Sequence, residues 1–254
     1  MTSALTIHTY GNQSGPTVVV LHGLSDSGTN FPDLVARWQQ DWHIVAPDMR
    51  AHGTSPRFRP QEMATSGEIM HADVLEIIDA QTEPVALLGH SMGGALALRA
   101  AVARPEKVWA LVLEDPAHAT GGPSPSDVST RFGEFVAEVS ARMERGELDR
   151  LIAEGTWSPT ETREWAISKP QVQRDYLANG LHLGGQSWDE LIAALTVPTL
   201  LVVPARDSVA PPGSAAGNPL LTEVVIAGAG HCVRRDQPEA YFDAVETFLA
   251  SHRG

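Results

Sequence analysis

The segment Gly89 to Gly94 constrains this chain more than any other, because it places a serine between glycines where a strand pattern changes to a helix pattern. It reads Gly-His-Ser-Met-Gly-Gly and lies between the apolar run Val85 to Leu88 and an Ala-rich stretch that ends at Arg104. A serine on a tight strand-to-helix turn adopts strained backbone angles, and side chains two positions before and after it would collide. The turn pushes the Ser91 hydroxyl out at the sheet edge. Ser91 is therefore our candidate nucleophile.

Six short apolar runs alternate with helical patterns, which is typical of a mostly parallel sheet with helices on both faces. Several runs are apolar at nearly every position, which indicates strands that are buried on both faces. The Ala-rich helix after Ser91 carries almost no charge, so we expect it to be central and buried. The runs are Thr17 to Leu21, His43 to Ala46, Val85 to Leu88, Val108 to Leu113, Thr199 to Val203 and Glu223 to Ala227.

The alternation breaks after Pro116, and residues 117–196 contain no strand-like run. Apolar residues at helical spacing predict a helix that stops at Gly146. Two further helix starts have the capping-box pattern, at Ser158 with Glu161 and at Ser187 with Glu190. An insertion between two strands of one sheet lies over the carboxyl edge, where ligands bind in open α/β sheets. We therefore predict a helical cap at 117–196 and a core made of 1–116 and 197–254.

The predicted cap holds six of the fifteen aromatic residues, which favours an apolar substrate. Single tryptophans are more often core residues than ligand contacts, so a helical layer that merely packs on the sheet is the alternative interpretation. Our candidates for lining a substrate pocket are Phe132, Trp157, Trp165, His182 and Trp188.

A serine hydroxyl is a weak nucleophile and needs a base that a third group holds in place. His231 is the candidate base, because a glycine-rich loop after the last strand-like run can bring its imidazole over the sheet edge, and because it follows the serine in the chain. Asp207 directly follows a predicted strand and is our candidate for the acid. Glu114 and Asp115 compete for this role, because they end another strand at the same edge, and Glu114 is our alternative acid.

The oxyanion that forms when a serine attacks an acyl carbon needs two backbone N–H donors. One candidate is the amide of Met92, directly after the nucleophile. The other is the amide of Leu24, in the loop His22-Gly23-Leu24 that follows the first predicted strand. Losing one such donor typically costs about 3 kcal/mol of transition-state stabilisation.

With these segments in place, the chain resembles the α/β-hydrolase superfamily over nearly its whole length. Ala51 stands where the family pattern D-x-R-G-H-G-x-S has a glycine, and Ala205 stands near a position where a glycine often precedes the acid. Serine at position 91, in place of aspartate, disfavours the haloalkane dehalogenase and epoxide hydrolase branches. The resemblance rests on His22-Gly23, Asp48 to Ser55, Gly89 to Gly93, Asp207 and His231.

This resemblance implies an α/β-hydrolase fold, with a mostly parallel central sheet flanked by helices and an inserted helical cap. The function that we predict is a serine hydrolase that cleaves a carboxylic ester or lactone of an apolar small molecule through an acyl-enzyme. The resemblance leaves open a cofactor-free haloperoxidase or perhydrolase and a C–C bond hydrolase with the same triad. A small-ligand receptor of the same fold is the alternative from another class. This chemistry implies no metal and no organic cofactor.

Composition narrows the partners and the compartment. Acidic residues number 31 and basic residues 18, so the formal charge is −13, which disfavours nucleic acid and anionic lipid as partners. No run of about 18 consecutive apolar residues predicts a membrane span, and the first residues lack the pattern of a secretory signal. The single cysteine, Cys232, fits a reducing compartment, so we expect a cytoplasmic protein. The sequence leaves open whether it is a monomer or a homodimer.

Overall fold

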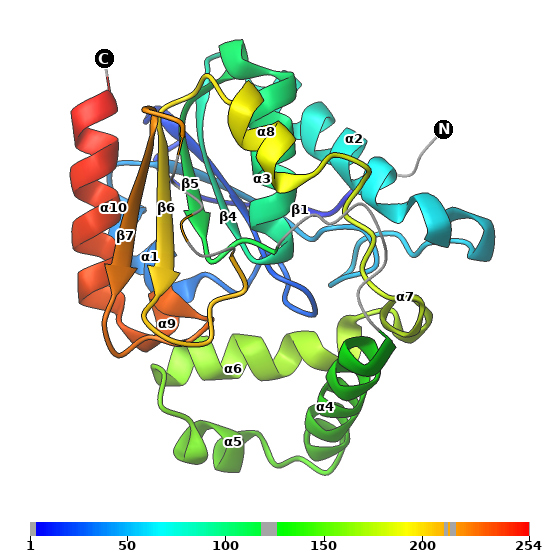
Figure 1. Ribbon diagram of the computed structural model, residues 1–254. Coiled ribbons are helices and arrows are strands. Elements are labelled where there is room, and N and C mark those ends of the chain that lie inside the picture. The colour runs from blue at the N-terminus through cyan, green and yellow to red at the C-terminus, as the bar shows by residue number, and fades with distance from the viewer. Residues whose placement is uncertain (1–3, 118–125, 211–212, 214–216, 254) are drawn as a thin grey trace.

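The computed structural model describes residues 4–117, 126–210, 213 and 217–253. A seven-stranded sheet lies at its centre, with helices packed around it (Figure 1). The strand order is β1-β3-β2-β4-β5-β6-β7, and every neighbouring pair is parallel except β1 with β3. The strands are β1 (Ile7–Gly11), β2 (Thr17–Leu21), β3 (His43–Pro47), β4 (Val85–His90), β5 (Val108–Glu114), β6 (Thr199–Pro204) and β7 (Leu221–Ile226).

The six predicted strands are confirmed as β2 to β7, with ends that differ by at most two residues. Strand β1 was not predicted. It is the antiparallel edge strand, it pairs only with β3, and its side chains alternate between exposed and half-buried. An edge strand of this kind has no continuous apolar run that would distinguish it from a loop in the sequence.

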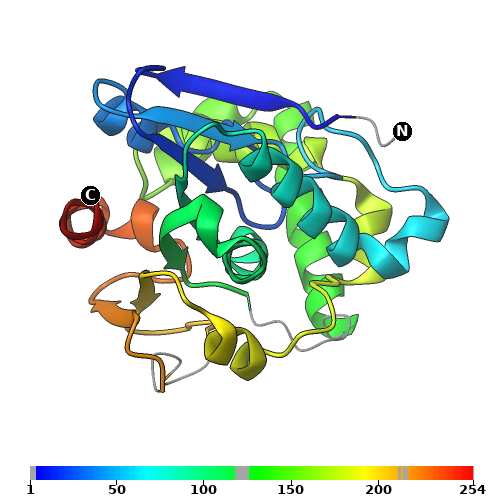
Figure 2. The ribbon, with the colours of Figure 1, turned by 90° about the horizontal axis from the view of Figure 1, so that it is seen from above.

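Helices cover both faces of the sheet, as predicted. Alternate residues of β2 enter different cores: Val18 and Val20 pack with α1 (Pro32–Trp38) and α10 (Pro238–His252), whereas Val19 and Leu21 pack with helices on the opposite face. Figure 2 shows α10 (red) on one side of the sheet, with three helices of the core on the other side. Those helices are α2 (Ser66–Asp79), α3 (Met92–Ala103) and α8 (Trp188–Ala194).

Four helices lie together beyond the carboxyl ends of the strands, and we call them the cap helices (Figure 1). They are α4 (Ser126–Glu144), α5 (Leu148–Glu154), α6 (Pro159–Ser168) and α7 (Arg174–Asn179). Two small cores hold them, one around Val136 and one around Val139. The predicted range 117–196 also includes α8, but α8 packs in the core beside α3, and residues 118–125 lie outside the described residues.

Short helical turns complete the described part of the chain. They are η1 (Pro60–Thr65), η2 (Pro105–Lys107), η3 (Lys169–Gln171) and α9 (Val233–Asp236). None of the described helices combines the length and the apolar character that a membrane-spanning helix requires.

Three buried histidines are held as neutral rings beneath the carboxyl edge. His22 Nε2 accepts the Met49 amide at 2.9 Å, which leaves Nδ1 as the donor to the Gly23 carbonyl at 2.8 Å. His52 Nδ1 donates to the Arg50 carbonyl at 2.9 Å. Burial lowers the pKa of His22, and it lowers the pKa values of His52 and His90 to about 3.

We expect the free energy of unfolding to fall as the pH drops below about 6.5, because the unfolded chain then binds protons that the buried rings do not. Each such histidine contributes a slope of about 1.4 kcal/mol per pH unit between its unfolded and folded pKa values. Urea unfolding between pH 7.5 and 5.5 measures this slope. His52→Asn should flatten this slope by the contribution of one proton, because the asparagine takes up no proton when the chain unfolds. An unchanged slope in His52→Asn would contradict this account.

Candidate active site

Ser91 occupies a strained turn between β4 and α3, as its glycine neighbours predict. Its backbone angles are φ 51° and ψ −116°, in a region that L-residues rarely adopt. A Cβ atom on Gly89 would lie 2.3 Å from the Gly93 carbonyl oxygen, and one on Gly93 would lie 2.3 Å from the Leu21 carbonyl oxygen. Only glycine fits at both positions, so the backbone of β2, the turn and the start of α3 can meet this closely.

His231 follows β7 and pairs with Asp115, the residue directly after β5. Its Nδ1 atom lies 2.7 Å from Asp115 Oδ2. Asp115 is completely buried, and it also accepts the Ser208 hydroxyl at 2.5 Å and the Ala210 amide at 3.2 Å. Burial by itself would raise the pKa of Asp115, but the hydrogen bonds from His231 and Ser208 hold it below its usual range. The carboxylate therefore keeps the proton of the imidazole on Nδ1 and leaves Nε2 as a base.

The structure corrects the prediction of the acid that pairs with His231. The sequence favoured Asp207 for this role, with Glu114 as the alternative, whereas the structure has Asp115 there. The Asp207 side chain is exposed. The loop after β6 that contains it bonds Asp115 through the backbone amides of Val209 and Ala210. Glu114 points elsewhere: it accepts the Arg234 amide at 2.8 Å, and burial raises its pKa. The sequence placed Glu114 and Asp115 together at the end of one strand, and only the direction of each side chain separates them.

Both predicted oxyanion donors lie beside Ser91. Met92 is the first residue of α3, where an amide has no acceptor within the helix. Leu24 lies in the tight turn between Gly23 and Asp26, closed by the Asp26 amide on the Gly23 carbonyl at 3.1 Å. A Cβ on Gly23 would lie 3.4 Å from Ser91 Cβ, which shows how closely this backbone approaches the serine. We name residues 22–27 the oxyanion loop.

His90 and Cys232 are the neighbours of Ser91 and His231 in the sequence. The first supports the site by a hydrogen bond, and the second is not a competing nucleophile. His90 Nε2 donates to the His231 carbonyl at 3.0 Å. This bond connects the end of β4 to the loop between β7 and α9, residues 227–232, which we call the histidine loop. Cys232 also borders the site, but burial raises the pKa of its thiol to about 11. The thiol is therefore protonated at neutral pH and is a poor nucleophile.

A cavity of about 590 Å³ connects Ser91 and His231 with the cap helices. Three of the predicted pocket residues, Phe132, Trp157 and Trp165, line it. Sequence reasoning did not select six further residues of the cap helices, of η3 and of α9 that also border it, namely Ser129, Leu177 and four larger side chains. These four are Phe135, Lys169, Tyr176 and Arg235. Phe135 follows Phe132 by three positions on one helix, a signal that could have placed it on the same face.

The other two predicted pocket residues do not reach this cavity. Trp188 is 3% exposed and packs in the hydrophobic core at the start of α8. His182 borders a separate cleft of about 150 Å³, together with Glu68 and Gly184. The chain leaves the cap after α7 and returns to the side of the sheet (Figure 1). Leu181 still borders the cavity, but Leu183 and Trp188 pack in the core with α3.

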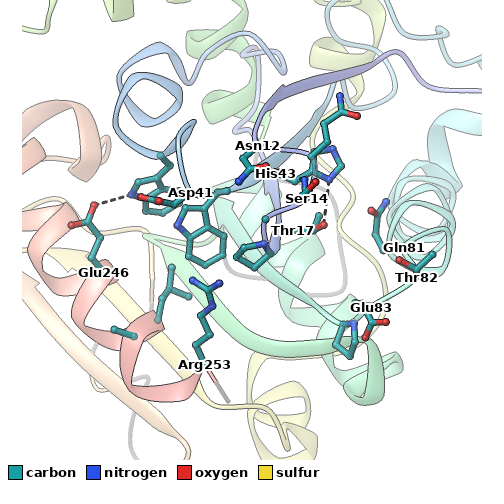
Figure 3. Close-up of a pocket in the computed structure, with 18 of the residues that line it drawn as sticks. Asn12, Ser14, Thr17, Asp41, His43, Gln81, Thr82, Glu83, Glu246 and Arg253 are labelled. Carbon is teal, nitrogen blue, oxygen red and sulfur yellow. Dashed lines mark hydrogen bonds between the residues drawn. The ribbon is translucent and has the colours of Figure 1, made fainter.

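A larger cavity of about 1070 Å³ lies at the opposite end of the sheet (Figure 3). Asp41, Trp42 and Arg253 are among its lining residues, and Thr17 bonds His43 there at 3.3 Å. Helices α1, α2 and α10 end near it, and helix C-termini present carbonyl groups that disfavour a developing anion. Acyl chemistry is therefore expected at the other edge. Among the described residues, no cluster of three or more histidine, cysteine, aspartate or glutamate side chains could hold a metal ion.

The comparison with protein families decides where this chain belongs. The model of the alpha/beta hydrolase family matches residues 18–244. The chain belongs to the alpha/beta hydrolase family. This membership and the observed sheet confirm the predicted fold class.

Similar proteins span nearly the whole chain. A pimeloyl-[acyl-carrier protein] methyl ester esterase from Xanthomonas axonopodis pv. citri is 29% identical over 93% of this chain and 96% of its own length. A sn-1-specific diacylglycerol lipase from Mus musculus is 27% identical over 94% of this chain and 83% of its own length. Among solved structures, a marine microorganism esterase has the same fold, with a TM-score of 0.71, 24% identity and coverage of 97% of this chain and 99% of that one.

Exchange of the histidine's partner tests the role of Asp115 directly. We expect Asp115→Asn to lower the rate at which a fluorophosphonate labels Ser91 by roughly 10³-fold, because an amide partner favours the tautomer that cannot accept the serine proton. Asp207→Asn, the matched control, should label at the wild-type rate. Intact-protein mass spectrometry over time gives both rates. Slow labelling in Asp207→Asn with fast labelling in Asp115→Asn would restore the sequence prediction.

Proposed function

We propose that this protein is a serine hydrolase that cleaves carboxylic esters or lactones of apolar small molecules through an acyl-enzyme intermediate. The observation that carries the proposal is that His231, paired with the buried Asp115, borders the same cavity as the strained Ser91. A nucleophile, a base held by a carboxylate and two backbone donors are the groups that acyl transfer requires.

In the acylation step, His231 Nε2 takes the hydroxyl proton as Ser91 Oγ attacks the carbonyl carbon. The new bond forms as the carbonyl double bond becomes an oxyanion, which the amides of Leu24 and Met92 stabilise. Asp115 stabilises the imidazolium through Nδ1. His231 then gives its proton to the leaving alcohol oxygen, the carbon–oxygen bond breaks, and the acyl group stays on Ser91.

Deacylation repeats these roles with water as the nucleophile. His231 removes a proton from a water molecule, and the hydroxide attacks the acyl carbon. The same two amides stabilise the second oxyanion. When it collapses, the proton returns to Ser91 Oγ and the carboxylic acid leaves. In a lactone both products remain one hydroxy acid, because the alcohol and the acyl group belong to the same molecule.

The cavity favours an apolar substrate of small-molecule size. Its volume of about 590 Å³ lies within the range of roughly 300–1,000 Å³ typical of small-ligand sites. Aromatic side chains of the cap, among them Phe132, Phe135 and Trp165, form much of its wall. The relatives named as a methyl ester esterase and a diacylglycerol lipase add support for ester chemistry.

Steady turnover of nitrophenyl esters tests this function. We expect wild-type protein to hydrolyse butyrate and hexanoate esters with many turnovers, and Ser91→Ala to lose activity to the level of the uncatalysed reaction. Turnover should favour the longer acyl chain until the cavity is filled, because each buried CH₂ adds about 0.8 kcal/mol of binding. A panel of aromatic and macrocyclic lactones in the same assay separates the two bond types.

Several outcomes would contradict the proposal. Tight binding with at most one turnover points to a small-ligand receptor of the same fold. Peracid formation from acetate and hydrogen peroxide, or cleavage of a vinylogous 1,5-diketone, without ester turnover points to a perhydrolase or a C–C bond hydrolase. Labelling by a phosphonate that survives in Ser91→Ala would remove the nucleophile assignment.

A further inference from the structure

Five buried charged side chains join the cap to the two loops of the site. All five are almost completely buried: Glu161 comes from α6, Lys169 comes from the turn η3 between α6 and α7, and Asp26, Arg234 and Arg235 come from the core. Buried ion pairs of this kind are costly to desolvate, and apolar residues often stabilise a fold equally well. Their place in the fold therefore needs an explanation beyond stability.

Lys169 contacts the oxyanion loop directly. Its Nζ atom donates to Asp26 Oδ1 at 2.6 Å and to the Ser25 carbonyl at 3.2 Å. The hydroxyl of Ser168 lies 3.1 Å from the same carbonyl. Burial by itself would raise the pKa of Asp26, but the cationic Arg235 and Lys169 hold it well below its usual range. The carboxylate is thus ionised and accepts a full charge-assisted bond from the cap.

The segment that Lys169 holds is strained next to the oxyanion donor. Ser25 has φ 66°, in the left-handed region that costs a non-glycine residue about 1 kcal/mol or more. Such a conformation persists only where surrounding contacts enforce it. The Leu24 amide belongs to the peptide between Gly23 and Leu24, and the carbonyl of that peptide accepts the Asp26 amide. The Asp26 amide belongs in turn to the same peptide as the Ser25 carbonyl, which Lys169 holds. A rotation of the Ser25–Asp26 peptide therefore turns the peptide that carries the Leu24 amide.

The same cluster reaches the histidine loop from the opposite side. Arg235 Nη2 donates to Asp26 Oδ2 at 2.9 Å, and its Nε donates to Glu161 Oε2 at 2.9 Å. The cap residue Trp157 donates to Asp236 Oδ1 at 2.6 Å, and Asp236 Oδ2 accepts the amide of Gly230, the residue before His231, at 2.7 Å. Both loops of the site are thus connected to the cap, the oxyanion loop by buried and the histidine loop by half-buried polar contacts.

We propose that Lys169 is a positioning residue of the proposed hydrolysis, whose ammonium group, supplied from the cap, holds the oxyanion loop in the conformation that aims the Leu24 amide at the developing oxyanion. The proposal rests on the proposed function. In this role the cap is part of the catalytic framework and does more than enclose the substrate. Lys169 itself acts through the loop and does not contact the reacting atoms.

Lys169→Met keeps the apolar stem and removes the charge, so it isolates this role. We expect kcat for nitrophenyl butyrate to fall by roughly 10- to 100-fold, with KM within about threefold, because one oxyanion donor is misaligned while the cavity remains. The inhibition constant of an alkylboronic acid should rise by a similar factor, because its tetrahedral adduct on Ser91 uses the same donors. Ser168→Ala should move both quantities in the same direction by a smaller factor.

Val139→Ala is the control for a loss of cap packing, since Val139 is buried with Leu151 and Ala166 in the second small core of the cap and carries no polar group that could bond the five charges. It should lower the melting temperature and leave kcat and boronate inhibition within about twofold. An active wild type whose Lys169→Met variant melts earlier but keeps both quantities would overturn the role of Lys169 alone. A wild type without turnover would refute the proposed function and this role with it. If Lys169→Met does not fold, Ser168→Ala becomes the test. An unchanged kcat and an unchanged boronate inhibition constant in that variant would overturn the role of Lys169.

Discussion

The close approach of β2, β4 and α3 around Ser91 is the constraint on which the rest of the site depends. Gly93 lets the start of α3 lie against the Leu21 carbonyl, and Gly89 lets the turn close on Gly93 itself. Because no side chain separates these backbones, the loop after β2 passes directly beside the serine. The helix amide and the loop amide then lie near one hydroxyl, as a shared oxyanion requires. The price of this packing is the left-handed strain at Ser91.

The remaining parts of the site come from three other strand ends. Asp115 after β5 and His231 after β7 meet across β6, and the loop after β6 supplies amides that hold the Asp115 carboxylate. The parallel arrangement brings these ends to one edge, where the loops can exchange hydrogen bonds over sequence separations of about a hundred residues. The cap adds a second layer of contacts, and these contacts change the predicted capping box at the start of α6. Ser158 accepts the Glu161 amide, as predicted. The Glu161 carboxylate, however, bonds Arg234 and Arg235 in place of the amide at its own helix start.

Sequence patterns predicted the buried strands, the central helix and the turn at Ser91, because each depends on neighbours within about ten residues. Apolar runs mark strands buried on both faces, and the glycine spacing around Ser91 has one steric interpretation. The same reasoning missed β1, whose exposed edge leaves no apolar run. It also assigned Trp188 and His182 to the pocket, because aromatic content does not reveal where the chain leaves the cap and returns to the core.

The sequence by itself determined the family, the candidate nucleophile and the candidate base, since these are local motifs in a required chain order. Only the tertiary structure decided which carboxylate faces His231. Glu114, Asp115 and Asp207 all stand at strand ends of the same edge, and their chemistry is nearly identical. Their roles differ because the direction of a side chain at a strand end is set by the loops that pack on it, here the amides that surround Asp115 and leave Asp207 in solvent. Long-range packing of this kind has no local signature in a single sequence.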